Sequence, residues 1–320
     1  MKNILVTLEM DEAHRRFLEE QAEGCRESYS IVYKALDDVT PEDVAAADAI
    51  LGNCHRKALK GAQKLEWMQL PSAGANLYVG PGILPEETVL TNSSGAYGLT
   101  VSEHMVALTF AVMRRLGEYA RKQQAHVWEA KGEVFPIEGS TALILGVGDI
   151  GGRYARKMQA LGAYTIGIRR TEKEKPDWLD EQYTFDKLDE VLPRADIVAM
   201  VLPGSPETEH IMDERRLRLM KKNAVIVNDG RGSAIDPVAL KKVLKEGHLF
   251  GAGLDVTEPE PLPADDEFWD MPNVIVTPHS GGQFLMQETY EKVVRIFGVN
   301  LHRYLNGEEL KHIVDKKAGY

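Results

Sequence analysis

One segment, Thr141–Arg153, limits what this chain can fold into more than any other. It predicts a buried strand, a glycine turn and the start of an amphipathic helix. Gly146 lets the chain reverse tightly, Gly148 lets a pyrophosphate approach the backbone, and Gly151 lets the helix pack closely on the strand. Phosphates at such a helix N-terminus meet free N–H groups and the helix dipole. A glycine-rich turn without a ligand is the alternative.

Composition sets the wider limits. The chain has 320 residues, 43% of them hydrophobic and 27% charged, which suits two domains with proper cores. We predict a cytoplasmic protein without a membrane partner, because no apolar run could span a bilayer, the N-terminus lacks a signal peptide's regions, and Cys25 and Cys54 are too few for a disulfide framework. The net charge of −11 argues against a nucleic-acid partner and leaves an anionic substrate dependent on a local cation.

The hydrophobic pattern predicts strands that alternate with helices, which is typical of parallel α/β layers. A first unit ends near residues 91–98, and the alternation resumes at Thr141. The predicted strands are residues 3–8, 29–33, 49–52 and 67–70 in the first half, and 141–145, 165–168, 196–201, 224–228, 250–255 and 274–277 in the second. Predicted helices include residues 11–24, 237–247 and a long closing helix over 287–305.

The connection between the two halves has its own pattern. Thr100-Val-Ser-Glu103 matches a capping box, so we expect a helix to begin there, and its all-round apolar character predicts burial. The polar segment from Arg114 to Pro136 contains Trp128 and Phe135. Large aromatic side chains in an extended connection need a place to be buried, so we expect this segment to contact a partner subunit.

Three polar residues follow predicted strand ends, the edge at which open α/β sheets bind ligands. They are Arg231, Glu260 and His279. An arginine there can clamp a carboxylate with two parallel N–H bonds, and a histidine can exchange a proton with a carbonyl or hydroxyl oxygen. A carboxylate bonded to that histidine orients the ring and favours its protonated form. Each residue taken singly could instead be an ordinary loop residue.

These motifs, taken in order, resemble the D-isomer-specific 2-hydroxyacid dehydrogenases along essentially the whole chain. Besides the glycine turn, the resemblance is carried by Val227-Asn-Asp-Gly-Arg-Gly232, Gly253-Leu-Asp-Val-Thr-Glu-Pro-Glu-Pro-Leu-Pro263 and Thr277-Pro-His-Ser-Gly-Gly282. It implies two doubly wound parallel-sheet, Rossmann-like α/β domains with a cleft between them. The substrate-binding domain would be residues 1–98 plus 288–320, and the dinucleotide-binding domain residues 99–287.

The resemblance also implies roles for single residues. Arg231 would bind the substrate's carboxylate and carbonyl, Glu260 would be the catalytic glutamate, His279 the acid/base, and Asp255 the residue that holds the nicotinamide amide. Backbone groups of Ser72, Ala73 and Gly74 would hold the substrate carboxylate. The remaining cofactor contacts would come from Gly146, Gly148, Asp149, Ile150, Gly151, Leu202, Pro203, Thr208, Asn228, Asp229, Gly230 and Gly281. The histidines show no spacing typical of a metal site, and we predict no metal.

The chain departs from the NAD-binding pattern at one place. An NAD enzyme has an acidic residue about 20 residues past the glycines, bonded to the ribose hydroxyls. This chain has Arg169, Arg170 and Thr171 there. Two guanidinium groups and a hydroxyl would bind a 2′-phosphate, so we predict that NADP(H) is preferred and NAD(H) possible. A solvated turn is the alternative.

We therefore predict an NADPH-dependent reductase of small 2-oxo acids that produces D-2-hydroxy acids and acts as a homodimer, as the family does. A formate dehydrogenase of the same superfamily is one alternative, although a glutamine is expected there beside the histidine in place of Glu260. A dinucleotide-sensing corepressor of the same fold is the other. The sequence does not name the 2-oxo acid.

Overall fold

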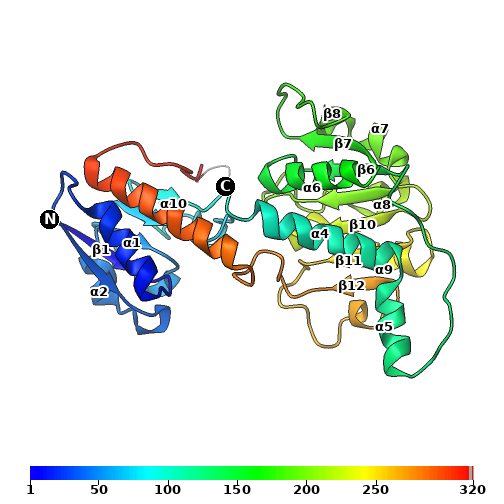
Figure 1. Cartoon of the computed structure of the whole chain (residues 1–320), viewed down its shortest axis with the longest axis horizontal. Coiled ribbons are helices and arrows are strands. Elements are labelled where there is room, and N and C mark those ends of the chain that lie inside the picture. The colour runs from blue at the N-terminus through cyan, green and yellow to red at the C-terminus, as the bar shows by residue number, and fades with distance from the viewer. Residues whose placement is uncertain (317–318, 320) are drawn as a thin grey trace. The chain divides into compact units, whose positions relative to one another are not determined.

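Two parallel sheets organise the chain, and each belongs to its own compact unit (Figure 1). The computed structural model describes residues 1–316 and 319, so the end of the predicted 288–320 segment lies partly outside the described residues. Unit 1 comprises Met1–Tyr97 and Met286–Tyr320, and unit 2 comprises Gly98–Leu285. These boundaries fall one or two residues before the predicted ones. Within the described residues, no helix is long and apolar enough to cross a bilayer.

Unit 1 is a five-stranded parallel sheet in the order β2-β1-β3-β4-β5. Helix α10 lies beside α1 (Figure 1). A cluster that includes Leu5, Ile50 and Met68 packs against Val44 of α2 and Ala58 of α3. The elements are β1 (Lys2–Val6), α1 (Glu12–Ala22), β2 (Tyr29–Tyr33), α2 (Pro41–Ala46), β3 (Ala49–Leu51), α3 (Arg56–Leu59), β4 (Trp67–Gln69), β5 (Val89–Thr91) and α10 (Gln287–Asn306).

Unit 2 is a seven-stranded parallel sheet in the order β12-β11-β10-β9-β6-β7-β8, the doubly wound arrangement in which the strand order reverses beside β6. Its strands are β6 (Thr141–Leu145), β7 (Tyr164–Arg169), β8 (Glu181–Thr184), β9 (Ile197–Met200), β10 (Val225–Asn228), β11 (Gly251–Leu254) and β12 (Val274–Val276). Its helices are α4 (Gly98–Met113), α5 (Leu116–Gln124), α6 (Asp149–Ala160), α7 (Leu188–Val191), α8 (Glu214–Leu219) and α9 (Pro237–Lys245).

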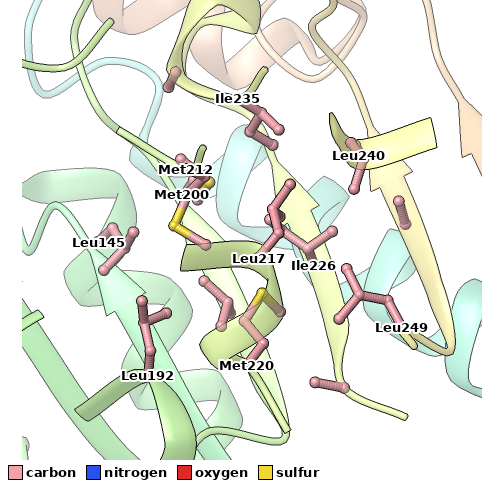
Figure 2. Packing of buried hydrophobic residues seen from close by; sticks show 14 of the residues in the cluster. Leu145, Leu192, Met200, Met212, Leu217, Met220, Ile226, Ile235, Leu240 and Leu249 are labelled. Atoms are coloured by element: carbon pink, nitrogen blue, oxygen red, sulfur yellow. The ribbon is translucent and has the colours of Figure 1, made fainter. Parts of the chain in front are cut away.

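The core of unit 2 follows the two-residue period of its strands. Leu145 of β6 and Ile226 of β10 join a buried cluster with Leu217 of α8 and Leu240 of α9 (Figure 2). Residues that alternate with these point to the other face, where Ile144 lies beside Gly151 of α6. The central strands are buried on both faces, which explains their nearly continuous apolar runs.

The start of α4 differs from the prediction. The helix begins at Gly98, so Thr100 lies inside its first turn and donates its hydroxyl hydrogen to the carbonyl of Gly281 at 3.3 Å. The predicted capping box is therefore wrong. Burial of the helix is also incomplete, because Phe110 is exposed although Met105 and Leu108 are buried.

The segment after α4 is only partly extended. It contains α5, which the sequence did not predict, and Phe135 packs edge-to-face on Phe250 of the same chain with ring centroids 5.0 Å apart. The expectation that both aromatic residues need a partner is wrong for Phe135. Trp128 is different, because it is 104% exposed.

Candidate active site

The carboxyl edge of the seven-stranded sheet carries the three side chains of unit 2 that the sequence predicts to be catalytic. Arg231 follows β10, Glu260 lies in the loop after β11, and His279 follows β12. Because these three strands are neighbours in the order β12-β11-β10, their loops leave the sheet side by side. The parallel arrangement explains how residues 48 positions apart in the sequence come to one edge.

Glu260 and His279 form a hydrogen-bonded pair. Nδ1 of His279 lies 3.1 Å from Oε2 of Glu260, and both side chains are nearly half exposed. The other oxygen of Glu260 accepts the N–H of Thr257 at 3.2 Å, which fixes the carboxylate. The backbone N–H of His279 donates to the carbonyl of Asp255 at 2.8 Å. The imidazole is therefore oriented through Nδ1, and Nε2 remains available for a proton exchange.

Arg231 lies deeper than the histidine. Burial lowers the pKa of its guanidinium, and the negative charge of Glu260 acts in the opposite direction, so the two side chains interact electrostatically. Nη1 donates to the carbonyl of Gly230 at 2.7 Å. A partly desolvated guanidinium beside a histidine–carboxylate pair can bind the carboxylate of a small acid strongly, since hydrogen bonds between ions gain strength where water is excluded.

The loop that presents Arg231 is held by its own residues. The side chain of Asn228 donates to the carbonyl of Arg231 at 2.9 Å and accepts the N–H of Gly230 at 3.1 Å. A Cβ atom on Gly232 would lie 1.8 Å from the carbonyl oxygen of Thr257, so only glycine permits this approach of the β10 loop to the β11 loop. The buried Asn228 side chain therefore shapes the loop that presents Arg231.

Asp255 is an ionised carboxylate in a complete hydrogen-bond network. Oδ1 accepts the hydroxyl of Thr277 at 2.6 Å and the N–H of Ser280 at 2.8 Å, and Oδ2 accepts the N–H of Gly281 at 3.0 Å. Burial pushes the pKa of Asp255 upward, but hydrogen bonds from His104, Thr277 and Ser280 outweigh it and leave this pKa below its ordinary value. The network fixes the residue that the resemblance assigns to the nicotinamide amide.

A cluster that the sequence did not reveal lies beside Asp255. One oxygen of Asp229, one of Asp255 and a ring nitrogen of His104 lie within 4.8 Å of one another. His104 comes from α4, so no short spacing in the sequence could have shown this convergence. The spacing would suit a cation, but Nε2 of His104 lies 2.9 Å from the hydroxyl of Thr277, whose hydrogen is used by Asp255. Nε2 therefore carries a hydrogen, and we assign no metal here.

The glycine turn has the shape that a dinucleotide requires. A Cβ atom on Gly151 would lie 2.0 Å from the carbonyl oxygen of Gly146, whereas one on Gly148 would project into open space. Gly148 is the N-cap of α6, so the first N–H groups of the helix face that space. Asp149 is engaged with Arg153, whose Nε donates to it at 2.9 Å, and Ile150 follows it in the first turn. These residues fit a pyrophosphate.

The predicted 2′-phosphate residues lie at the carboxyl end of β7, whose last residue is Arg169, and in the turn after it. Nη1 of Arg169 lies 3.5 Å from the side-chain oxygen of Gln182 on β8, and Thr171 lines a cavity of about 550 Å³. The hydroxyl of Ser205 and, more weakly, the charge of Arg170 lower the pKa of Glu207, so Arg170 faces the loop after β9. Thr208 holds that loop through its hydroxyl, which donates to Pro203 at 2.7 Å, and Leu202 is buried beneath it.

The remaining predicted contacts lie in unit 1. Ser72, Ala73 and Gly74 form the turn that follows β4, again at the carboxyl end of a parallel strand. The hydroxyl of Ser72 donates to the carbonyl of Gly74 at 2.7 Å, and Asn92 donates to the carbonyl of Ala73 at 2.8 Å. The turn is therefore held rigid from within its own unit.

Comparison with known proteins agrees with this geometry. The family model for the D-isomer specific 2-hydroxyacid dehydrogenase, NAD binding domain, matches residues 106–281. A glyoxylate reductase of Korarchaeum cryptofilum is 34% identical over 237 residues, which cover 72% of this chain and 70% of the relative.

Solved structures resemble the whole chain. An NADPH-dependent glyoxylate/hydroxypyruvate reductase from Sinorhizobium meliloti, in complex with NADP and sulfate, has a TM-score of 0.82 at 26% identity and covers 100% of both chains. A family protein from Aeromonas salmonicida subsp. salmonicida has a TM-score of 0.85 at 28% identity, covering 98% of this chain and 99% of that one. By sequence and by fold, this chain belongs to the oxidoreductases of the D-isomer specific 2-hydroxyacid dehydrogenase family.

Proposed function

We propose that this protein is an NADPH-dependent reductase that converts a small 2-oxo acid into the D-2-hydroxy acid. The observation that carries the proposal is the Glu260–His279 pair beside the half-buried Arg231. The relatives named glyoxylate reductase and glyoxylate/hydroxypyruvate reductase support a short substrate.

The reaction follows from what each side chain offers. Arg231 binds the substrate carboxylate and draws electron density from the adjacent carbonyl. His279 gives a proton to the developing alkoxide, and Glu260 stabilises the charged imidazole and holds its orientation. Asp255 binds the nicotinamide amide, so that the ring is positioned for reaction. The bound cofactor supplies the hydride.

The two units have separate roles in this proposal. Unit 2 binds the dinucleotide and supplies the catalytic side chains, and unit 1 is the substrate-binding domain. The cytoplasmic location also belongs to the proposal and rests on the two free thiols, Cys25 and Cys54. The net charge of −11 supports a small-molecule partner over a nucleic acid.

A panel of 2-oxo acids, measured by absorbance with NADPH and separately with NADH, tests the function. We expect turnover of short 2-oxo acids such as glyoxylate and hydroxypyruvate, with higher kcat/KM for NADPH. Tight cofactor binding without turnover of any substrate would contradict the proposal and favour the dinucleotide sensor. Oxidation of formate would favour the other alternative.

Replacing Arg169 and Arg170 together with alanine is expected to raise the KM for NADPH by about 10- to 100-fold, because each charge-assisted bond to a phosphate contributes roughly 1.5–3 kcal/mol and exposed sites realise only part of it. The KM for NADH should change little. Steady-state kinetics with both cofactors measure the difference, and Lys245→Ala, which removes an exposed cation of α9 paired with Glu267, is the matched control. An equal effect on both cofactors would refute the assignment.

A homodimer completes the proposal. Trp128 and Val127 are exposed beside a groove of about 680 Å³ that Tyr119 and His126 also line. A second copy of the chain is the occupant expected from the family. Trp128→Ala should weaken the dimer at least about 30-fold, the effect of losing a central aromatic contact. Sedimentation equilibrium measures this, with Val238→Ala, an exposed apolar residue of α9, as the control. A monomeric unaltered protein would contradict the dimer.

A further inference from the structure

The carboxyl group of Asp229 is buried without a partner. The residue is 8% exposed, and among the residues that the structure describes, none donates a hydrogen bond to either of its oxygens. A buried carboxylate without donors is strongly disfavoured against its neutral form. The shape of the loop does not require the carboxyl group of Asp229, because the side chain of Asn228 and the close approach at Gly232 already hold the turn.

The surroundings of Asp229 make the negative form still less favourable. The ionised Asp255 approaches from the end of β11. Gly281 is also close, because a Cβ atom added to it would lie only 3.2 Å from Oδ1 of Asp229. His104 faces the cluster from α4, and Tyr154 faces it from α6 with its hydroxyl bonded to Thr109. Burial raises the pKa of Asp229 well above its ordinary value, and the charge of Asp255 raises it further.

The side chain stands next to the residue assigned to the nicotinamide. This step rests on the proposed function, in which Asp255 binds the amide of the ring. The oxidised ring carries one positive charge and the reduced ring carries none. A positive charge beside the cluster would attract an ionised Asp229 and so favour loss of its proton, and the attraction is strong where water is excluded. Arg231, two residues further on, is the nearest cation along this loop.

We propose that Asp229 is a positioning residue behind Asp255 that holds a proton in the free protein and releases it when the oxidised cofactor binds. The proton leaves to bulk water, and the carboxylate that remains balances the charge of the ring. The reduced cofactor binds to the neutral form and releases nothing. Affinity for NADP⁺ therefore rises with pH relative to affinity for NADPH.

The cofactor test compares the dissociation constants of NADP⁺ and NADPH between pH 6.5 and pH 9 by fluorescence titration. Both cofactors carry the same 2′-phosphate, so its titration cancels in the ratio. In the unaltered protein we expect NADP⁺ affinity to rise relative to NADPH by up to about tenfold per pH unit. Asp229→Asn, a neutral group of the same shape, should make the ratio independent of pH, and the exposed Asp265→Asn should leave it unchanged.

Proton release measured on the unaltered protein needs no variant. In weakly buffered solution with an indicator dye, NADP⁺ should release a fraction of a proton per site, and NADPH should release less. Equal release by both cofactors, or a ratio that Asp229→Asn leaves pH-dependent, would overturn the proposal. Binding of Mg²⁺ or Zn²⁺ that Asp229→Asn abolishes would also overturn it, because a cation would then occupy the cluster.

The protonation state of Asp229 can also be tested in the protein without cofactor, through the pH dependence of unfolding. An acid whose pKa is raised on folding destabilises the folded state progressively as pH rises from its unfolded pKa, 3.8, to its folded pKa. The unfolding equilibrium constant of the unaltered protein should therefore increase relative to that of Asp229→Asn by up to about tenfold per pH unit above pH 4. A constant ratio would show that Asp229 is ionised, which contradicts the proposal. Failure of both cofactors to bind would refute the proposed function, whereas this measurement would still decide the state of Asp229.

Discussion

Replacing His279 with alanine is expected to lower kcat by about 10²- to 10⁴-fold, the usual contribution of a positioned general acid. The dissociation constant of NADPH should stay nearly unchanged, because the side chain of His279 bonds to Glu260 and only its backbone N–H contacts Asp255. Single-turnover kinetics at saturating substrate, together with fluorescence titration of NADPH, separate the two quantities.

Two controls make this result specific. His279 has a left-handed backbone with φ of 51°, which asparagine tolerates better than most residues, so His279→Asn should be as inactive as the alanine variant without added strain. His210 provides the matched control, because it forms a similar histidine–glutamate pair. Its Nε2 lies 2.7 Å from Oε2 of Glu258, and its side chain is about as exposed as that of His279. His210→Ala should keep kcat within about threefold. Activity that survives in His279→Ala would refute the assignment of the acid.

The second large effect concerns Arg231. Arg231→Ala should lower kcat/KM for a 2-oxo acid by on the order of 10²- to 10³-fold, because removing one partner of a desolvated, hydrogen-bonded ion pair costs roughly 2–5 kcal/mol. Arg231→Lys keeps the charge but loses the planar fork, and it should recover only part of the loss. Steady-state kinetics measure both variants, and NADPH affinity should stay within a few fold.

A substrate without a carboxylate sharpens this prediction. Reduction of a simple aldehyde or ketone should be slow in the unaltered protein and should lose much less on Arg231→Ala, since such a substrate lacks the carboxylate and keeps only the weaker contact of Arg231 with the carbonyl. Arg215→Ala, which removes an exposed arginine paired with Asp189, is the control for a loss of positive charge in the same unit. Comparable losses with both types of substrate would indicate that Arg231 serves folding and does not bind the carboxylate.

The elements with strong apolar signals are those that the sequence predicted. Strands such as β6 and β10 are buried on both faces, so their apolar runs are unbroken. Strand β8 was not predicted, because its sequence, Glu181-Gln-Tyr-Thr184, has no apolar run, and all four residues are half-buried at the edge of the sheet. The start of α4 was placed too late, because a Thr-x-x-Glu spacing also occurs inside helices and only the backbone shows where Gly98 begins the turn.

The candidate site also has one part that the sequence predicted and one part that only the structure shows. The resemblance assigns the catalytic glutamate to Glu260, and the structure pairs Glu260 with His279 and the nearby Glu258 with His210. The neighbourhood of Asp229 was beyond reach, because it is assembled from α4, from two strand ends and from Gly281, and no local pattern connects them. Sequence spacing predicts which loop carries a side chain, but burial and the loss of hydrogen-bond donors depend on packing between distant segments.

The division of the chain has a consequence for its synthesis. Unit 2 is continuous from Gly98 to Leu285, whereas unit 1 needs α10 to cover α1 and also needs Ile313, which bridges to Thr91. A growing chain emerges from the ribosome in order, and domains generally fold as units. The strands of unit 1 that precede Gly98 therefore wait, with one face of their sheet unprotected, until the dinucleotide-binding unit has been completed. Chaperones that bind nascent chains would find a target in these strands.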